Sequence, residues 1–404
     1  MTGLIGSDTL RGLSDALDEA LRLQQSRLLS PDHRKSDKPL RRFTIREMAD
    51  LAFRINYNTL RHYLKTYDDL PEGIMEPGNK RTYSLEEIHE IQQRLHDEGK
   101  IPDALYPGKF EGESTTKILC YNLKGGVSKT STVANLAQFL ALRGFKVLII
   151  DLDPQSSCSD LFDVQADLDN IPSIYNVLCY EDLEEGVRPI PMADAVQATY
   201  FDNIDIVPGS ISLTEFEYET ASAAARGVPF YSRISEALST IEQAYDVVLF
   251  DTPPHMSFSV IAALYASNSM LIPLSAGMLD VVSLVKFLEL ASGTLASIEG
   301  VDPSKRFDFV RILLTRYSPS DPAQLQLSSF LRMVLGQTML KTDFLNSTAI
   351  ADAGNTMSPL LEIDPGDFTR KTYDRILESL QGIALEIEAE IMQARGRSSL
   401  KGGN

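Results

Sequence analysis

The stretch that most constrains the fold covers residues 124–130, which read Lys-Gly-Gly-Val-Ser-Lys-Thr. An apolar run at 118–123 precedes it and predicts a buried strand, and residues 130–143 predict a helix that ends at Gly144. A strand, a glycine loop, a Lys-Thr pair and a helix together build a phosphate cradle, because the loop and the helix start point N–H groups at one anion. We therefore predict a nucleotide site here. The alternative is an ordinary strand–helix turn with two solvated lysines.

The loop departs from the standard pattern G-x-x-x-x-G-K-[ST], because Leu123 and Ser128 stand where glycine is required. It matches the variant K-G-G-x-x-K-[ST] and so resembles the deviant Walker A ATPases. In such a loop Lys129 reaches the β- and γ-phosphates of ATP or ADP, and the Thr130 hydroxyl holds Mg²⁺. The extra Lys124 suggests a nucleotide-dependent dimer. The predicted nucleotide contacts are Lys124, Gly125, Gly126, Val127, Ser128, Lys129, Thr130 and Ser131.

Three aspartates follow two further apolar runs. The run at 146–150 ends in Asp151-Leu152-Asp153, and the run at 245–250 ends in Asp251. Carboxylates at the carboxyl ends of parallel strands can support Mg²⁺ and orient an attacking water. We expect Asp151 and Asp153 to position the water and metal shell, and Asp251 to hold the metal. The alternative for each is a helix cap or a loop charge.

The rest of residues 111–404 alternates predicted strands and helices. Strands are expected at 204–208, 270–274 and 309–315, and helices at 232–243, 281–292 and 322–335. This alternation predicts an α/β fold with a mostly parallel sheet covered by helices on both faces. Nucleotides bind at the carboxyl ends of such strands, so Pro273 and Thr315, which end two of them, are candidate adenine contacts. Either could instead be a simple strand terminator.

The three segments 124–130, 151–155 and 250–254 resemble the nucleotide motifs of the ParA partition ATPases, and the resemblance covers roughly residues 115–365. It implies an ATPase in which ATP is sandwiched between two protomers and Lys124 crosses to the partner's nucleotide. It also implies that the homodimer binds DNA without sequence preference and that a ParB-type centromere-binding protein triggers hydrolysis. The catalytic residues would be Lys124, Lys129, Asp151 and Asp153, and the metal residues Thr130, Asp151 and Asp251.

Residues 34–110 have the pattern of a winged helix-turn-helix. A short amphipathic helix is expected at 44–52 with Thr44 as its cap, a second helix at 58–65, a basic wing at 79–83, and a further helix after a capping box at Ser84. Residues 33–65 hold nine Lys or Arg against three acids, which suits contacts with DNA phosphates. The expected DNA contacts are Arg46, Asn58, Thr59, Arg61, His62, Lys65, Lys80 and Arg81. The alternative is a small helical domain that only packs on the ATPase.

This N-terminal arrangement is similar to the winged helix-turn-helix of the longer partition ATPases. With the opening at 43–47 and the end of the wing at 81–84, it most resembles the RepA proteins of repABC plasmids. That resemblance implies a plasmid partition ATPase that also binds an operator and represses its own operon.

Two amphipathic segments flank these domains. Residues 7–29 carry leucines at helical spacing, so we expect residues 1–33 to be a dimerisation helix; the alternative is a helix folded onto its own chain. Residues 367–394 carry an apolar stripe opposite a face with Glu378, Glu386, Glu388 and Glu390. A membrane-seeking helix would be basic on that face, so this one is expected to pack on the body of the protein.

Charge and cysteine content bound the remaining possibilities. The net charge is −18, of which residues 111–404 carry −17, so DNA binding by the ATPase body would need a local basic patch. Three cysteines without paired spacing predict a reducing compartment and no zinc site. We expect no signal peptide and no apolar run long enough to span a membrane, hence a cytoplasmic, nucleoid-associated protein.

Two rival functions are compatible with the motifs. One is a nucleotide-sensing transcription repressor that hardly hydrolyses ATP, which the departure at Ser128 favours. The other is a metabolic P-loop enzyme related to dethiobiotin synthetase, which the basic N-terminal module argues against.

Overall fold

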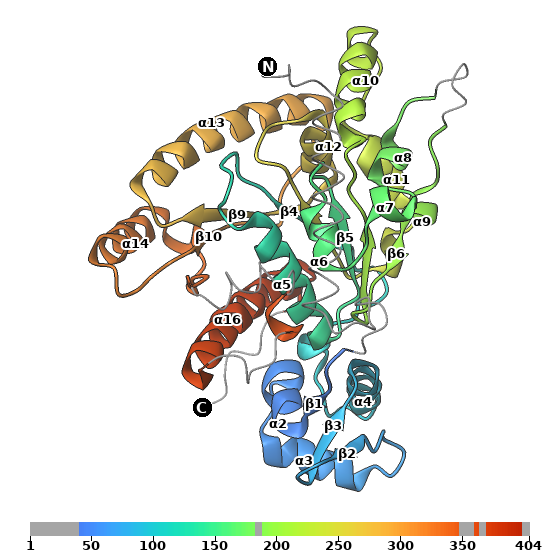
Figure 1. Cartoon of the computed structure of the whole chain (residues 1–404), viewed down its shortest axis with the longest axis vertical. Coiled ribbons are helices and arrows are strands. Elements are labelled where there is room, and N and C mark those ends of the chain that lie inside the picture. The colour runs from blue at the N-terminus through green and yellow to red at the C-terminus, as the bar shows by residue number, and fades with distance from the viewer. Residues whose placement is uncertain (1–39, 182–187, 347–358, 363–368, 398–404) are drawn as a thin grey trace, which may run out of the picture. The chain divides into compact units, whose positions relative to one another are not determined.

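A computed structural model describes residues 40–181, 188–346, 359–362 and 369–397 (Figure 1). The chain divides into two units, Met1–Pro39 and Leu40–Asn404, and every described residue belongs to the second. The predicted dimerisation helix at 7–29 therefore lies outside the described residues.

The second unit is built on a seven-stranded sheet with the order β10-β9-β4-β8-β5-β7-β6 (Figure 1). Its neighbouring strands run parallel except for the β6–β7 pair. This confirms the predicted α/β class with a mostly parallel sheet. The strands are β4 (Thr116–Cys120), β5 (Val147–Asp151), β6 (Gln197–Ala198), β7 (Ile204–Val207), β8 (Val247–Asp251), β9 (Ser269–Ser275) and β10 (Phe309–Thr315).

Helices cover both faces of this sheet, because alternate strand residues feed two separate apolar clusters. In β4, Ile118 and Cys120 belong to one cluster and Leu119 to the other. The first cluster contains α5 (Lys129–Arg143) and α16 (Arg370–Ala394). The second contains residues of α8 (Ile174–Leu178), α9 (Met192–Ala195), α10 (Leu213–Ala225), α11 (Arg233–Ser239), α12 (Phe258–Ala266), α13 (Met278–Val301) and α14 (Pro322–Leu335). Two short helices, α6 (Ser157–Leu161) and α7 (Ala166–Asp169), follow β5.

The N-terminal module has a strand at the predicted wing and helices over the three segments that were expected to be helical, together with two strands that its sequence did not predict. Its three-stranded antiparallel sheet joins β1 (Phe43–Thr44), β3 (Lys80–Tyr83) and β2 (Ile74–Glu76). Its helices are α2 (Ile45–Glu47), α3 (Tyr57–Thr66) and α4 (Leu85–Asp97). Thr44 and Ser84 both form reciprocal capping boxes with the glutamate three residues on.

The first helix of this module differs from the regular helix that we expected. After one turn of α2 the chain continues as a π-helical segment, Met48–Phe53, and Arg54 then adopts a left-handed conformation with φ 56°. A π-helical turn shifts the backbone hydrogen bonds by one residue, and such turns occur frequently at functional sites.

Two sequence expectations need correction. The helix α13 is long and apolar enough to cross a membrane by length and composition, although we expected no such run. It carries only four charged residues in 24, and it connects β9 to β10 as a crossover of the parallel sheet.

The prediction of an acidic outer face on α16 is also partly wrong, because Glu388 is buried and ion-paired with Arg143.

Candidate nucleotide site

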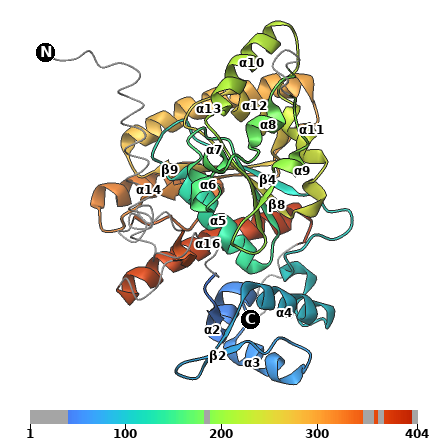
Figure 2. The same cartoon turned by 45° about the vertical axis from the view of Figure 1, so that its right-hand side comes forward.

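The phosphate loop lies between β4 and α5, at the carboxyl edge of the sheet (Figures 1 and 2). Gly126 (φ 73°) and Ser128 (φ 65°) both have left-handed backbone conformations, which glycine adopts freely and serine only with strain. The Asn122 side chain fixes the entry to the loop: its Oδ1 accepts a hydrogen bond from the Lys124 N–H at 3.1 Å. Its Nδ2 donates to the carbonyl of Pro273 at 2.8 Å.

The other side of the loop is held from the end of β10. The Thr315 hydroxyl donates to the Val127 carbonyl at 3.1 Å, and the Arg316 guanidinium donates to the Gly126 carbonyl at 3.0 Å. Because these bonds engage loop carbonyls, they help to turn the N–H groups of the loop away from β10. A loop whose N–H groups converge is what anion binding requires.

Lys129 is the first residue of α5 and is almost fully buried, with 7% of its surface exposed. Its Nζ donates to the carbonyl of Lys124 at 3.2 Å, across the loop. Burial lowers the pKa of this ammonium group, while Asp251 and Asp153 act in the opposite direction. A cation held inside a closed loop of backbone amides can neutralise phosphate charge.

Asp251 ends β8 and is fully buried beside the loop. Its Oδ2 accepts a hydrogen bond from the Thr130 hydroxyl at 2.8 Å, while its Oδ1 has no hydrogen-bond partner within the described chain. Burial, reinforced by the nearby Asp151, raises the pKa of Asp251 well above its usual range. A buried carboxylate oxygen without a partner, next to a threonine hydroxyl, is a donor set that fits Mg²⁺.

Asp151 lies directly opposite Asp251 in the β5–β8 ladder. Its Oδ2 accepts from both the N–H (2.9 Å) and the hydroxyl (2.7 Å) of Ser159, and its Oδ1 accepts from the N–H of Asp153 (3.1 Å). Burial raises its pKa to about 6 despite these donors. Gly209 packs so closely that an added Cβ would lie 2.8 Å from the carbonyl of Asp153. Asp151 is therefore rigidly placed behind the predicted metal position.

Lys124 forms an ion pair with Asp280, in the first turn of α13. Its side chain is 39% exposed, so it lies at the rim of the site, unlike Lys129. The Asp153 carboxylate caps its own loop by accepting from the N–H of Gln155 at 2.9 Å. Ser131 lies in the first turn of α5, where its carbonyl accepts from Asn135.

Pro273 is the predicted contact whose position differs from the expectation. It does not end its strand, because β9 continues to Ser275 in register with Thr315. β4 pairs with β9 only as far as Leu271, so the proline, which lacks an N–H group, is tolerated where β9 has a neighbour on one side. Thr315 does end β10, as predicted, and is fully buried. Contacts of either residue with adenine remain predictions.

The predicted DNA contacts are on a different part of the molecule. They lie on α2, on α3 and on the β2–β3 hairpin, and Thr59 is partly buried. The other predicted contacts are exposed, namely Arg46, Asn58, Arg61, His62, Lys65, Lys80 and Arg81. On α3 the inward residue Leu60 is fully buried, as the helical spacing predicted. The module therefore keeps its basic side chains away from its own core.

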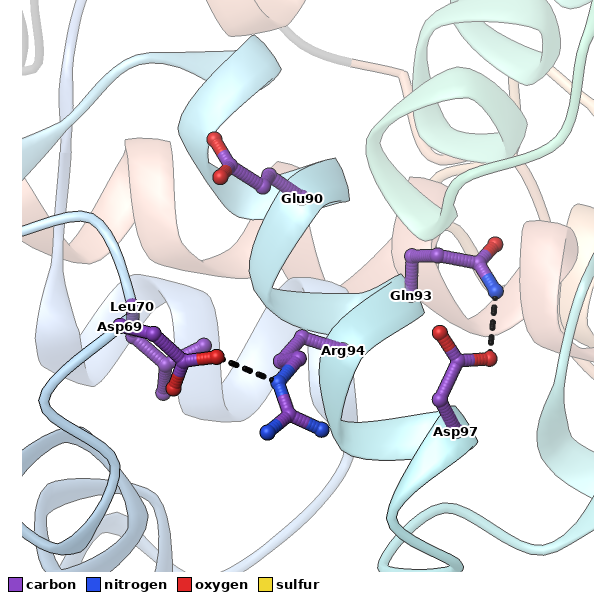
Figure 3. A pocket seen from close by; sticks show the side chains of 6 residues that line it. All are labelled: Asp69, Leu70, Glu90, Gln93, Arg94 and Asp97. Atoms are coloured by element: carbon purple, nitrogen blue, oxygen red, sulfur yellow. Dashed lines mark hydrogen bonds and ion pairs between the residues drawn. The ribbon is translucent and has the colours of Figure 1, made fainter.

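A shallow hollow of about 290 Å³ lies on the N-terminal module, between α4 and the loop after α3 (Figure 3). Its only cation, Arg94, donates to Asp69 at 2.7 Å and also pairs with Glu98. The remaining charged residues of its lining, Glu90 and Asp97, are acidic. This hollow offers no group that would hold a phosphate, so it is not a second nucleotide site.

Three residues that position the site were missed by sequence reasoning. Asn122 and Ser159 lie within ten residues of the motifs and could have been suspected as polar residues in buried surroundings. Asp280 could not, because only the pairing of β9 with β4 brings it to the loop. Arg316 was singled out together with Thr315 as a candidate adenine contact, but here it holds the Gly126 carbonyl.

Comparison with known proteins points in one direction. The sequence model of a family described as an AAA domain matches residues 115–295. A protein of Rhizobium rhizogenes named "Putative replication protein A" is 36% identical over 392 residues, which is 95% of this chain and 94% of that protein. The sporulation initiation inhibitor protein Soj of Bacillus subtilis is 28% identical over 62% of this chain and 92% of its own length.

Solved structures agree on the fold. The AMPPNP complex of a plasmid partition protein from Borrelia burgdorferi superposes with a TM-score of 0.51 at 19% identity, covering 67% of this chain and 99% of its own. Cobyrinic acid a,c-diamide synthase from Mycobacterium smegmatis with ADP and magnesium reaches 0.53 at 21% identity, covering 71% of this chain and 100% of its own. The second similarity shows that this fold also serves a metabolic enzyme, so the fold alone does not separate the functions.

Proposed function

Since the chain belongs to the family of these replication proteins A, within the ParA/Soj group of P-loop ATPases, we propose that it is an ATP-dependent plasmid partition ATPase that dimerises on ATP, binds DNA and represses its own operon. Its place of action would be the nucleoid in the cytoplasm.

The observation that carries this proposal is the buried pair of Thr130 and Asp251 beside Lys129. The hydroxyl and the carboxylate lie 2.8 Å apart, and the second oxygen of Asp251 is buried without a partner within the described chain. Leaving such an oxygen unsatisfied costs roughly 1–3 kcal/mol, so a binding partner is expected for it. A metal-bound nucleotide in the loop would supply that partner.

Thr130 and Asp251 would hold Mg²⁺, and Asp151 would steady the water shell from behind. When bound, the metal would supply positive charge that offsets the negative charge developing during phosphoryl transfer. Lys129 would bind the same phosphates, and Asp153, at the rim of the site, would orient the attacking water. The nucleotide would be ATP or ADP, with Thr315 and Pro273 near the base.

Lys124 would act between protomers. Its ion pair with Asp280 lies at the rim of the loop and is partly exposed, so the side chain can leave Asp280 when a second protomer brings a triphosphate close. A cation supplied in trans neutralises phosphate only when two copies meet, which makes ATP a dimerisation switch. Hydrolysis would then depend on a ParB-type partner and on DNA, which the dimer would bind without sequence preference.

The exposed basic side chains of α3 and of the β2–β3 hairpin would contact operator DNA. Helix α3 would enter the major groove, with Arg61, His62 and Lys65 toward the DNA, and Lys80 and Arg81 would contact phosphates. The binding affinity should therefore fall steeply as salt rises.

The test combines turnover, assembly and DNA binding. We expect wild-type protein to dimerise with ATP and magnesium in sedimentation velocity, to hydrolyse ATP slowly, and to do so faster with DNA and the partner. We expect Lys124→Ala to lose nucleotide-dependent dimerisation but to retain ATP binding. Operator binding would be followed by gel shift on the upstream DNA of its own operon, with ADP and ATP compared.

Two results would redirect the proposal. Intact operator binding without stimulated turnover would identify a nucleotide-sensing repressor. A protein that stays monomeric with saturating ATP and magnesium would contradict the sandwich dimer.

A further inference from the structure

Helix α13 exposes an apolar face that no described part of the chain covers. Seven of the 17 large apolar side chains that are exposed in the described residues belong to this one helix. In its first half, Leu279 is 80% exposed, Met278 65% and Val285 54%. On its inner side only Leu284, Phe287 and Ile298 are buried. Exposed apolar patches of this kind mark interaction surfaces.

Along the outer side of α13, exposed residues recur at alternating intervals of three and four residues. The line of these residues, which we call the α13 seam, consists of Leu279, Val282, Lys286, Glu289, Gly293, Ala296 and Gly300, and all seven residues are exposed. That spacing is the heptad pattern of a helix that packs lengthwise against another helix. The helix is about 36 Å long, which is enough for five turns of contact.

The two halves of the seam differ in size. The first half presents Leu279 and Val282, and the second half presents Gly293, Ala296 and Gly300. A Cβ added at Gly293 or Gly300 would meet nothing within 4 Å, so the described chain leaves this space open. Small residues allow the backbone of a second helix to approach closely. The second half is thus shaped to receive bulky side chains, and the first half provides them.

We propose that the occupant of the α13 seam is the same helix of a second copy, packed antiparallel about a two-fold axis at the level between Phe287 and Leu288. In this arrangement Leu279 of one copy lies on the partner's Ala296, and Val282 lies on the partner's Gly293. Each bulky half fills the small half of the other copy. An isologous contact requires this kind of self-complementary surface.

Charge supports a second copy as the occupant. Asp280 and Glu299 are engaged within the chain, by Lys124 and Arg306. Lys286 and Glu289 form no ion pair within the described chain, and they lie on either side of the proposed two-fold axis with opposite signs. Antiparallel packing brings each Lys286 next to the partner's Glu289, which gives two equivalent ion pairs. A chain with a net charge of −18 repels its own copies elsewhere, so a self-contact needs such a locally balanced face.

This contact is distinct from the nucleotide-dependent dimer, because it is formed by α13 alone and needs no ATP. It can therefore be tested without nucleotide. The three native cysteines are buried, so a single cysteine introduced on the surface reports on its own surroundings.

The first experiment uses Leu290→Cys, which places one thiol on each side of the axis. Two packed helices have axes about 8–10 Å apart, so a short bismaleimide should link the two copies. We expect this link to form roughly tenfold faster than in the control variant Leu168→Cys, because contact raises the local thiol concentration. Leu168 is exposed to a similar extent, 53%, but lies on α7. Equal rates in the two variants would overturn the proposal.

The second experiment reverses charges in the Leu290→Cys background. Lys286→Glu places two acids opposite each other in each pair, so cross-linking should slow to the control rate. Adding Glu289→Lys restores opposite charges across the axis and should restore the cross-linking rate. Loss without recovery, in proteins with unchanged thermal unfolding, would contradict the antiparallel register.

The third measurement separates this occupant from a lipid surface. Sedimentation of the wild-type protein with vesicles of phosphatidylglycerol and phosphatidylcholine should leave it in solution. If the protein instead pellets with the vesicles and Leu279→Lys abolishes pelleting, the seam binds lipid and the proposal is wrong. ATP turnover of Leu279→Lys should stay at the wild-type value, so that failure of this contact is distinguishable from failure of the nucleotide site.

Discussion

The two ends of helix α5 make different kinds of contact, although one rigid element carries both. The N-terminal end begins at the phosphate loop with Lys129 and is surrounded by groups from the carboxyl edge of the sheet. The C-terminal end, at Arg143, packs against the N-terminal module and α16. We expect the first end to receive an anion, whereas the second is satisfied within the chain.

The C-terminal end is a buried polar junction. The Arg143 guanidinium donates to both carboxylate oxygens of Glu388, at 2.8 and 2.7 Å, and also to the carbonyl of Ala52 in the π-helical segment. The Gln92 amide donates to Ala52 and to the carbonyl of Arg143, at 3.2 and 3.1 Å. Segments that are far apart in the sequence therefore meet at one point. The predicted nucleotide loop and the predicted DNA-binding module therefore contact opposite ends of a single helix, so a shift of α5 would be felt at both ends.

The largest expected effect would break the C-terminal junction. Arg143→Ala leaves Glu388 buried without its partner, and loss of one member of a buried ion pair typically costs about 3–5 kcal/mol. We expect a large decrease in the free energy of unfolding, measured by urea denaturation. The double variant Arg143→Met/Glu388→Met should recover most of it, because no charge is left unpaired.

Arg311→Ala is the matched control for this prediction. Arg311 also pairs with a glutamate of α16, Glu390, but both side chains are partly exposed. Exposed pairs contribute about 0–1 kcal/mol, so this variant should unfold almost like the wild type. Equal losses in Arg143→Ala and Arg311→Ala would mean that the buried junction is not special.

The second prediction concerns the N-terminal end of α5. Lys129→Ala removes the buried cation from the loop, so ATP turnover should fall by roughly 100- to 1,000-fold, the usual cost of losing one preorganised charge-stabilising group. The control, Lys146→Ala, removes an exposed lysine just before β5 and should leave turnover unchanged. Turnover would be measured by phosphate release. If Lys129→Ala retained full turnover, the loop would not be the active site.

The third prediction returns to the C-terminal end and uses pH. His89 donates from Nε2 to the carbonyl of Ala141 at 2.7 Å, and its Nδ1 accepts from Asn203 at 3.1 Å, so the ring is held neutral. Burial lowers its pKa from 6.5 to about 4. The unfolded chain thus binds a proton at this histidine more readily than the folded protein does. The stabilisation by neutral His89 is complete above pH 6.5 and is lost as the pH falls toward 4. At pH 5 the loss is about 2 kcal/mol.

This loss is measured as a difference between proteins, because carboxylates also titrate in the acid range. Urea unfolding at pH 7 and pH 5 should show a larger drop for the wild type than for His89→Gln. His62→Gln, at an exposed position of α3, should behave like the wild type. Identical pH dependence in His89→Gln and the wild type would mean that His89 does not contribute to the loss of stability at low pH.

The two ends also differ in how far the sequence predicted them. The strand–loop–helix order and the aspartates at the carboxyl ends of β5 and β8 could be predicted because each depends on neighbours along the chain and on the period of apolar residues. The phosphate contacts of the loop residues stay predictions. Two long elements were predicted with their observed bounds: the strand predicted at 309–315 is β10, and the helix predicted at 322–335 is α14. These are strongly periodic segments, for which local signals suffice. The helix predicted at 281–292 was too short, because α13 spans Met278–Val301.

The junction could not be predicted in the same way. Glu388 was assigned to the exposed face of α16 because three other glutamates follow the same face, and helical spacing alone does not say which of them meets a buried arginine. The π-helical turn at 48–53 is likewise set by packing, since its freed carbonyl at Ala52 is bound by Arg143 from α5. Long-range pairing decides these features, and no local pattern encodes it.

The smallest expected effect tests the one residue of the loop that departs from the standard pattern. Ser128 precedes α5 with a φ of 65°, and its side chain makes no capping hydrogen bond. No hydrogen bond of the side chain therefore offsets the steric cost of the left-handed conformation. Ser128→Gly should therefore stabilise the protein by about 0.5–1 kcal/mol, less the entropy that glycine adds to the unfolded chain. Thermal unfolding without nucleotide would measure this gain in stability.

Ser156→Gly, at the equivalent left-handed position before α6, is the control for conformation alone, with φ 54°. If only Ser128→Gly also tightens ATP binding, the serine side chain crowds the phosphates; if both variants change stability alike and affinity stays constant, the departure matters only to the backbone.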